Sequence, residues 1–404
     1  MTLGLFFRRT ADNMYTVALS EKPMHRRSFL EQILGTCWAG ASLLEQAVFR
    51  AAQARAQSTS APANLFDIEK LADGIYGAVS HPAAMTAHNC NSVIFENADN
   101  ILIVDTHSKP SAAASLAAQI RKEITSKPVA YVVYTHFHWD HTQGGPAYKN
   151  IAPRPDFISS TVTRDLLSEH AEANFKASLE TLPAALETYR RRMAAAKQES
   201  EKSYFQTMIS QTLAYQAEMR SYEPVLPNVT FSQDLIIHDK AHDLHLAFRG
   251  RGHTAGDIVV YCPQKQVLAS GDLLHGWFPY FVDSYPTEWP RTLHALAEFE
   301  FRHVLGGHGP VQHTRDRLGQ EAEYIQELTE AVAKGKQAGR TARELQDTIT
   351  PASLTSLAGG DSGYSRFLID SRFTVSSETD APAAFLARGV RANVATLFRV
   401  LDRG

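Results

Sequence analysis

Thr135-His136-Phe137-His138-Trp139-Asp140-His141 directly follows the apolar run Val129-Ala130-Tyr131-Val132-Val133-Tyr134. The apolar run is typical of a buried β-strand, which delivers the next residues to the edge of a sheet. Imidazole nitrogens and carboxylate oxygens are ligands that suit Zn²⁺. His136 and His138 can point to the same side of an extended turn, whereas Asp140 and His141 are offset and can reach a second ion. The stretch therefore predicts a metal-binding turn, because a polar loop with this many histidines rarely arises by chance.

Length and composition set broad limits on the protein. The chain has 404 residues, of which 44% are hydrophobic and 21% charged, so it can bury a sizeable core. Its net charge of −3 lacks the basic character expected of a nucleic-acid-binding protein. We therefore expect a small-molecule substrate and no nucleic-acid partner.

The N-terminal region differs from the rest of the chain. The pair Arg26-Arg27 precedes a moderately apolar run over residues 33–49, and Ala54-Arg55-Ala56 then offers a small-x-small cleavage site. This pattern predicts a Tat-type signal region over residues 1–56, with Met24 as an alternative start, and a linker over 57–64. The run carries Glu45 and is too weak for a transmembrane helix, so we expect no stable membrane insertion after processing. A Tat signal would direct the protein to the periplasm or the medium. The alternative interpretation of this segment is a surface amphipathic helix.

Three later segments repeat one local pattern, in which a strand is followed by small residues and then by a metal-ligating side chain. They are Gly252-His253-Thr254, Ser270-Gly271-Asp272 and Gly306-Gly307-His308-Gly309. Together with the opening stretch, and in this order, they resemble the metallo-β-lactamase superfamily over roughly residues 65–160 and 226–315. The resemblance implies an α/β fold, the four-layer αβ/βα metallo-β-lactamase sandwich, over residues 65–315.

The resemblance also implies a set of ligands for two Zn²⁺ ions, with iron or manganese left open. His136, His138 and His253 would hold the first metal, Asp140, His141 and His308 the second, and Asp272 would bridge them. In this superfamily a hydroxide between the metals attacks an ester, lactone, thioester or amide carbonyl, with Asp140 as proton shuttle and Asp272 as the second catalytic carboxylate. Lactamase branches usually carry Cys or Ser where this chain has Asp272, although a β-lactam substrate stays open. A mono-iron sulfur dioxygenase-like oxidoreductase is the alternative on the same fold.

Other side chains near these ligands are candidates for supporting roles. Asp105 ends its strand and is expected to orient a ligand histidine from the second shell. The aromatic side chains next to the ligands are candidates for the wall of the substrate pocket, namely Trp139, Trp277, Phe278 and Tyr280, and packing in the core is the alternative for the run after Asp272. Contacts of His275 and His313 with substrate are left open, as is a disulfide between Cys90 and Cys262, for which two buried thiols are the alternative.

Two segments outside the resemblance are predicted from periodicity alone. Apolar residues spaced three and four apart predict a helical insert over residues 160–222, in which Pro183 is expected to begin a helix. A helical C-terminal extension is expected over residues 316–404. The insert could pack on the body, cover the metal site as a lid, or form the contact of a homodimer.

Overall fold

The computed structural model describes residues 65–80, 90–149, 151, 153–358, 363–375 and 382–402. The predicted signal region, the alternative start at Met24 and the linker all lie outside these residues. Within the described ranges, no helix combines the length and the apolar character needed to cross a membrane.

The first β-sheet runs in chain order from β1 to β7. Strands β1 to β4 pair antiparallel, whereas β4 to β7 run parallel to one another. The change comes at helix α3 (Pro110–Glu123), because a connection between parallel neighbours must cross over the sheet. The strands are β1 (Phe66–Ala72), β2 (Ile75–Ser80), β3 (Ser92–Glu96), β4 (Ile101–Val104), β5 (Val129–Val133), β6 (Asp156–Ser160) and β7 (Val229–Phe231).

The second sheet has the strand order β12-β11-β10-β9-β8. It is antiparallel except for the parallel pair β11 and β12, which helix α8 (Trp289–Ala295) and the 3-10 turn η2 (Leu296–Glu298) connect. The strands are β8 (Asp234–Ile237), β9 (Leu244–Phe248), β10 (Ile258–Cys262), β11 (Val267–Gly271) and β12 (His303–Gly306). Each half of the domain therefore ends in a strand–helix–strand unit.

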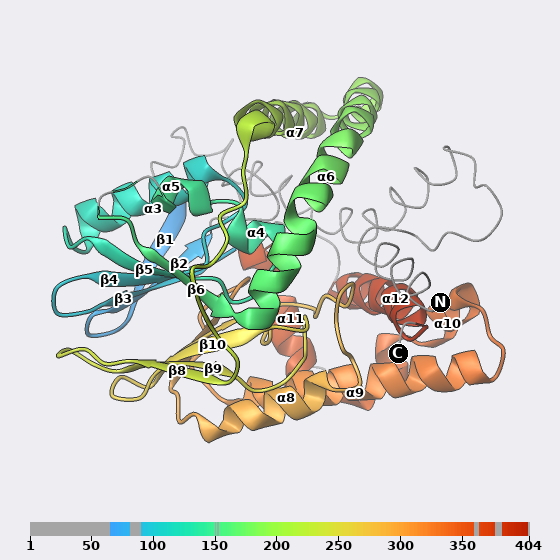
Figure 1. The fold of residues 1–404 in the computed structure, drawn as a ribbon. Helices are drawn as coiled ribbons and strands as arrows, with labels where there is room; N and C mark the ends of the chain where they lie inside the picture. Colours follow the sequence, from blue (N-terminus) through green and yellow to red (C-terminus); the bar gives the residue numbers. More distant parts are fainter. Residues whose placement is uncertain are drawn as a thin grey trace, which may run out of the picture.

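Alternating side chains build the layers. Val93 of β3 and Val260 of β10 belong to one core between the sheets. Their neighbours Ile94 and Val259 point the opposite way, towards α3 and towards the helices of the C-terminal half. Helices α3 and α5 (Gly145–Lys149) cover the outer face of the first sheet, while α8 and α9 (Asp316–Gln337) lie beneath the second (Figure 1). The predicted four-layer αβ/βα sandwich is confirmed.

The insert is a helical hairpin between β6 and β7, formed by α6 (Thr161–Ala195) and α7 (Glu199–Glu218) and followed by the 3-10 turn η1 (Met219–Ser221). The hairpin rises above the sandwich in Figure 1. The expectation that Pro183 begins a helix is wrong, because this residue lies inside α6. Its ring is exposed, and the apolar stripe through Leu179, Leu182 and Leu186 continues past it. Packing along that stripe outweighs the local cost of a proline in a helix.

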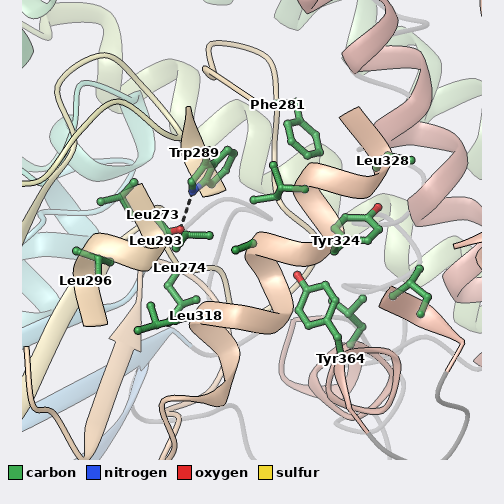
Figure 2. Packing of buried hydrophobic residues seen from close by; sticks show 14 of the residues in the cluster. Leu273, Leu274, Phe281, Trp289, Leu293, Leu296, Leu318, Tyr324, Leu328 and Tyr364 are labelled. Carbon is green, nitrogen blue, oxygen red and sulfur yellow. Dashed lines mark hydrogen bonds between the residues drawn. The ribbon is translucent and has the colours of Figure 1, made fainter. Parts of the chain in front are cut away.

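The C-terminal extension is also helical and covers the outer face of the second sheet. It contains α9, α10 (Ala342–Thr348), the 3-10 turns η3 (Pro351–Ser353) and η4 (Thr355–Leu357), α11 (Tyr364–Val375) and α12 (Pro382–Val400). Its buried residues form one core with those of α8, and the indole of Trp289 donates a hydrogen bond to the Leu273 carbonyl at 2.9 Å (Figure 2). The extension is thus part of the domain core, although the resemblance did not cover it.

Candidate metal centre

The first group of candidate ligands comes from two sheet edges. His136 and His138 lie in the turn after β5, and His253 lies in the turn between β9 and β10. The His138 Nδ1 and His253 Nε2 atoms are 2.9 Å apart, and one ligand atom from each of the three side chains falls within 4.8 Å of the others. These three histidines form the first cluster.

The second cluster contains Asp140, His141 and His308, whose ligand atoms also converge within 4.8 Å. Asp140 and His141 lie in the short helix α4 (Trp139–Thr142), while His308 follows β12. The His308 Nε2 atom is 3.2 Å from Asp140 Oδ2, and the His141 Nε2 atom is 3.7 Å from the same oxygen. The turn after β5 therefore contributes to both clusters.

Asp272, which follows β11, lies between the two clusters. Its Oδ2 atom is 3.4 Å from His253 Nε2 and 3.5 Å from His308 Nε2, and its Oδ1 atom is 3.5 Å from His141 Nε2. The structure thus brings all seven predicted ligands together, with Asp272 in contact with histidines of both clusters.

The chemistry of these atoms fits metal ions. The His136 Nε2, His141 Nε2 and Asp272 Oδ1 atoms are buried and have no hydrogen-bond partner in the described residues. Leaving such atoms unpaired costs about 1–3 kcal/mol each, and more for a charged group. Divalent ions bound by nitrogen and oxygen ligands would satisfy all of them at once. These unpaired nitrogen and oxygen atoms therefore fit a metal-binding site.

The two clusters differ in charge. Burial lowers the pKa values of His136 and His253 well below the ordinary imidazole value, so both rings are neutral and offer a lone pair. Burial acts in the same direction on His308, but the carboxylates of Asp272 and Asp140 outweigh it and raise the pKa of that imidazole. The carboxylates thus favour the charged form of His308 in the second cluster, whereas His136 and His253 in the first cluster are neutral.

Asp105 fixes the orientation of one ligand. Its Oδ2 atom lies 2.8 Å from His141 Nδ1 and accepts a hydrogen bond from the Thr135 hydroxyl, while its Oδ1 atom accepts one from the Thr135 amide. Asp105 has a φ of 62°, a left-handed conformation that few residues other than glycine adopt. The site thus places a buried carboxylate in a strained backbone position, directly behind a candidate ligand.

Sequence reasoning missed a second carboxylate of this kind. The Asp283 Oδ2 atom lies 3.0 Å from His138 Nε2, which leaves His138 Nδ1 to face the first cluster. Asp283 lies in the aromatic loop after Asp272, and a lone acidic residue in that loop was the available signal. Its pairing with a histidine 145 positions earlier could not be read from local sequence.

The aromatic candidates divide into two pairs. The Trp277 ring stacks on the His308 ring at 4.7 Å, and the Tyr280 side chain is half exposed, with its ring 6.3 Å from that of His138. Phe278 packs against the C-terminal helices. Trp139 makes an edge-to-face contact with Tyr215 of the helical insert. The structure therefore places Trp277 and Tyr280 beside the ligands, and places Phe278 and Trp139 under the added helices.

The two histidines left open also separate. His275 is buried and its Nε2 atom lies 3.4 Å from Asp272 Oδ2, whereas His313 is exposed and pairs with His303 at 2.8 Å. His275 thus faces a candidate ligand from within the protein, and His313 lies at the surface.

The two cysteines of the described chain are free and buried, so no disulfide links them there. Cys90 lies 3.5 Å from His107 Nδ1, close to the second cluster. Burial raises the pKa of the Cys90 thiol to about 12, which keeps it protonated at neutral pH and makes it a poor ligand.

Comparison with known proteins agrees with this architecture. The model of the metallo-beta-lactamase superfamily matches residues 85–308, more than half of the chain. Among solved structures, a metallo-beta-lactamase from Pontibacter korlensis is 19% identical with a TM-score of 0.47, and covers 65% of this chain and 99% of its own. A metallo-beta-lactamase from Erythrobacter litoralis is 16% identical with a TM-score of 0.45, at 65% and 99% coverage. The family match spans all seven candidate ligands, and the chain belongs to the metallo-beta-lactamase superfamily.

Proposed function

We propose that this protein is a dinuclear zinc hydrolase that cleaves an ester, lactone, thioester or amide of a small molecule. The observation that carries the proposal is the placement of Asp272. Its carboxylate lies within 3.5 Å of histidines from both clusters, which is the arrangement that would let one residue hold two metals together.

Each cluster has a distinct task in this proposal. His136, His138 and His253 would hold one zinc, and Asp140, His141 and His308 the other. Zinc in such a site supplies a Lewis acid for a carbonyl oxygen and a water that is nucleophilic at neutral pH. No serine or cysteine nucleophile is then needed, in keeping with the protonated state of Cys90.

Asp140 is the residue proposed to move a proton. Burial acts to raise its pKa, but His141 and His308 outweigh burial and bring the pKa below the usual carboxyl value. The group is therefore a carboxylate at neutral pH, able to accept a proton from the attacking water and to pass it to the leaving group. Asp105 and Asp283 hold the rings of His141 and His138 in place during that transfer.

The substrate is proposed to lie against Tyr280 and Trp277. The half-exposed Tyr280 ring offers an apolar face next to His138 and His253, and Trp277 covers His308. These rings favour a substrate with an apolar group beside its scissile carbonyl. The acidic character of the chain argues against polyanionic substrates.

The test combines metal analysis with a substrate panel. Protein lacking residues 1–56 is loaded with zinc, its metal content is measured, and a chromogenic cephalosporin, a lactone, an ester and a thioester are assayed. We expect two zinc ions per chain and turnover of at least one compound, and Asp272→Ala should lose metal and several orders of magnitude in rate. Full activity in Asp272→Ala with both metals bound would contradict the proposal, as would an iron-bound, oxygen-consuming protein.

We also propose export through the twin-arginine signal. Replacing Arg26 and Arg27 together by lysine should leave the protein in the cytoplasm, while the parent chain should be found outside it and begin after residue 56. Cell fractionation with N-terminal sequencing checks both. Equal distribution of the two proteins would contradict the export proposal and leave the hydrolase proposal intact.

A further inference from the structure

His275 lies between two buried carboxylates. Its Nε2 atom is 3.4 Å from Asp272 Oδ2, and its Nδ1 atom is 3.7 Å from Glu321 Oε1. The same Glu321 oxygen accepts a hydrogen bond from the backbone amide of His275 at 3.2 Å. Asp272, His275 and Glu321 therefore form a chain of contacts that leads away from the two metal clusters into the protein.

Glu321 belongs to the C-terminal extension and is completely buried. It lies in α9, beyond the residues that the family model matches, and its neighbours on the buried face include Tyr324 and Ile325. Its second carboxylate oxygen has no hydrogen-bond partner among the residues described. An apolar side chain would fill this position without the cost of burying a carboxylate. The acidic group is therefore best explained by its contact with His275.

The C-terminal extension also contacts Trp277 and Phe278, the two residues that follow Gly276. The Trp277 carbonyl accepts a hydrogen bond from the Tyr364 hydroxyl at 3.4 Å. The Phe278 ring occupies a notch in α12 at Gly389, where a Cβ atom would overlap the ring. Figure 2 shows Tyr324 and Tyr364 side by side in this core. Segment 275–278 is thus fixed by α9, α11 and α12 while it supports Asp272 and His308.

From this geometry we infer that Glu321 is a positioning residue for the metal centre, acting on Asp272 through His275. The inference rests on the proposed dinuclear site. A bridging carboxylate must direct its two oxygens to different clusters, and free rotation of the side chain would remove that arrangement. His275 Nε2 lies 3.4 Å from one of these oxygens. Glu321, which accepts a hydrogen bond from the His275 amide and lies 3.7 Å from His275 Nδ1, is placed to hold the ring in that position. Loss of such an orienting partner typically lowers metal affinity about 10–100-fold.

The first experiment compares Glu321→Gln with Glu327→Gln in the full chain. Glu327 lies on the same helix but bonds Thr355 and Ser356, far from the ligands, so it is a matched control. Metal-free protein is titrated with Co²⁺, following visible absorption and competition with a chelator. We expect the parent and Glu327→Gln to bind two ions alike. Glu321→Gln should bind the first ion normally and the second about 10–100-fold more weakly, with a changed spectrum.

A second variant separates positioning from general stability. Glu321→Met places an apolar side chain of similar length in the buried site and removes a carboxyl group whose second oxygen has no hydrogen-bond partner among the described residues, so we expect its Tm to stay close to that of the parent. Its second Co²⁺ ion should nevertheless bind more weakly. A variant that keeps its Tm but binds metal less well identifies positioning, because a purely structural role would lower both quantities together.

A third comparison tests the route through His275. If Glu321 acts only through this ring, adding Glu321→Gln to His275→Gln should cause no further loss of Co²⁺ affinity. If the losses of Co²⁺ affinity from the two substitutions multiply in the double variant, Glu321 does not act through His275. Parent-like Co²⁺ affinity and spectra in both Glu321 variants would overturn the inference while leaving the hydrolase proposal intact. A parent protein that binds no Co²⁺ or Zn²⁺ would overturn both.

Discussion

Two of the candidate ligand side chains contact carboxylates that lie outside the two clusters. His141 and His138 each direct one ring nitrogen towards a cluster, and carboxylates hold the other nitrogen of each ring, Asp105 for His141 and Asp283 for His138. This arrangement fixes both the tautomer and the ring angle of a ligand. Mutations of residues that touch no metal should therefore change metal affinity.

Asp105→Asn tests this at one position. Asparagine tolerates the positive φ of residue 105 better than other substitutes, so the change removes the charge without adding backbone strain. We expect metal affinity to fall about 10–100-fold with little loss of Tm, as measured by chelator competition. Asp243→Asn, which breaks an exposed aspartate–histidine contact with His238, should leave affinity unchanged. Equal affinities in the parent and Asp105→Asn would exclude an orienting role.

His107 should make folding stability depend on pH. It is buried, its Nδ1 atom is 2.8 Å from the Cys90 carbonyl, and burial lowers its pKa to about 3. The folded state therefore leaves the ring neutral below pH 6.5, where the unfolded chain takes up a proton. The stability from His107 is complete above that pH and is lost as pH falls towards 3, by up to about 1.4 kcal/mol per pH unit.

Denaturant unfolding of the parent and His107→Asn between pH 8 and pH 4 measures this loss. Asparagine suits the positive φ at this position and does not titrate. The parent should lose stability relative to the variant as the pH falls. The exposed His238→Asn is the control and should follow the parent. Parallel curves for the parent and His107→Asn would rule out the linkage.

At the scale of helices and strands, local sequence predicts some parts of the candidate site and misses others. The seven ligands were predictable, because His136, His138, Asp140 and His141 share one short stretch after a strand, and the other three each follow a strand and small residues. Asp283 and Glu321 were not, because their partners His138 and His275 are distant in sequence and only the fold brings them together. The course of α6 through Pro183 was missed for a related reason, since packing against α7 overrides the local preference.

The turn between β12 and His308 gives an element-scale prediction. A Cβ atom on Gly307 would overlap the Asp272 carboxylate and the His141 ring. Gly307→Ala should therefore displace ligands of the second cluster and abolish its metal binding, which elemental analysis of the purified protein can measure. Gly319→Ala in α9 is the matched change, because its added methyl group meets no described atom within 4 Å apart from its chain neighbours and the nearby backbone of its own helix. It should bind metal normally and gain about 0.5–1 kcal/mol.

Helix α6 yields a second prediction at this scale. Pro183→Ala restores an amide donor in the helix interior, at an exposed position where the ring contributes little packing. We expect a gain of about 1–3 kcal/mol in the stability of the insert, seen as slower amide hydrogen exchange along α6. Pro382→Ala is the comparison, because Pro382 is the first residue of α12, where proline is well tolerated. Unchanged exchange in Pro183→Ala would show that the proline does not weaken α6.

At the scale of the whole molecule, the C-terminal extension behaves as a layer of the sandwich. Periodicity predicted its helices, but could not predict that they share one core with α8 and the outer face of the second sheet. The expected homodimer through the insert stays a prediction, which light scattering of the purified protein would test.

Truncation after residue 315 should expose this core. Buried side chains such as Trp289, Leu293 and Val304 would lose the helices that cover them. We expect the shortened protein to be insoluble or to bind a hydrophobic dye strongly, with broadened thermal unfolding. A soluble truncated protein with cooperative unfolding would show that the superfamily region folds without the extension.

The notch at Gly389 also fixes an order of events during synthesis. Phe278 leaves the ribosome long before the helix that receives it, so its ring lacks this packing partner until α12 has emerged. Metal loading at the second cluster should therefore follow completion of this helix. Proteolysis that begins at the C-terminal end should, for the same reason, loosen the loop around Phe278 before it reaches the two sheets.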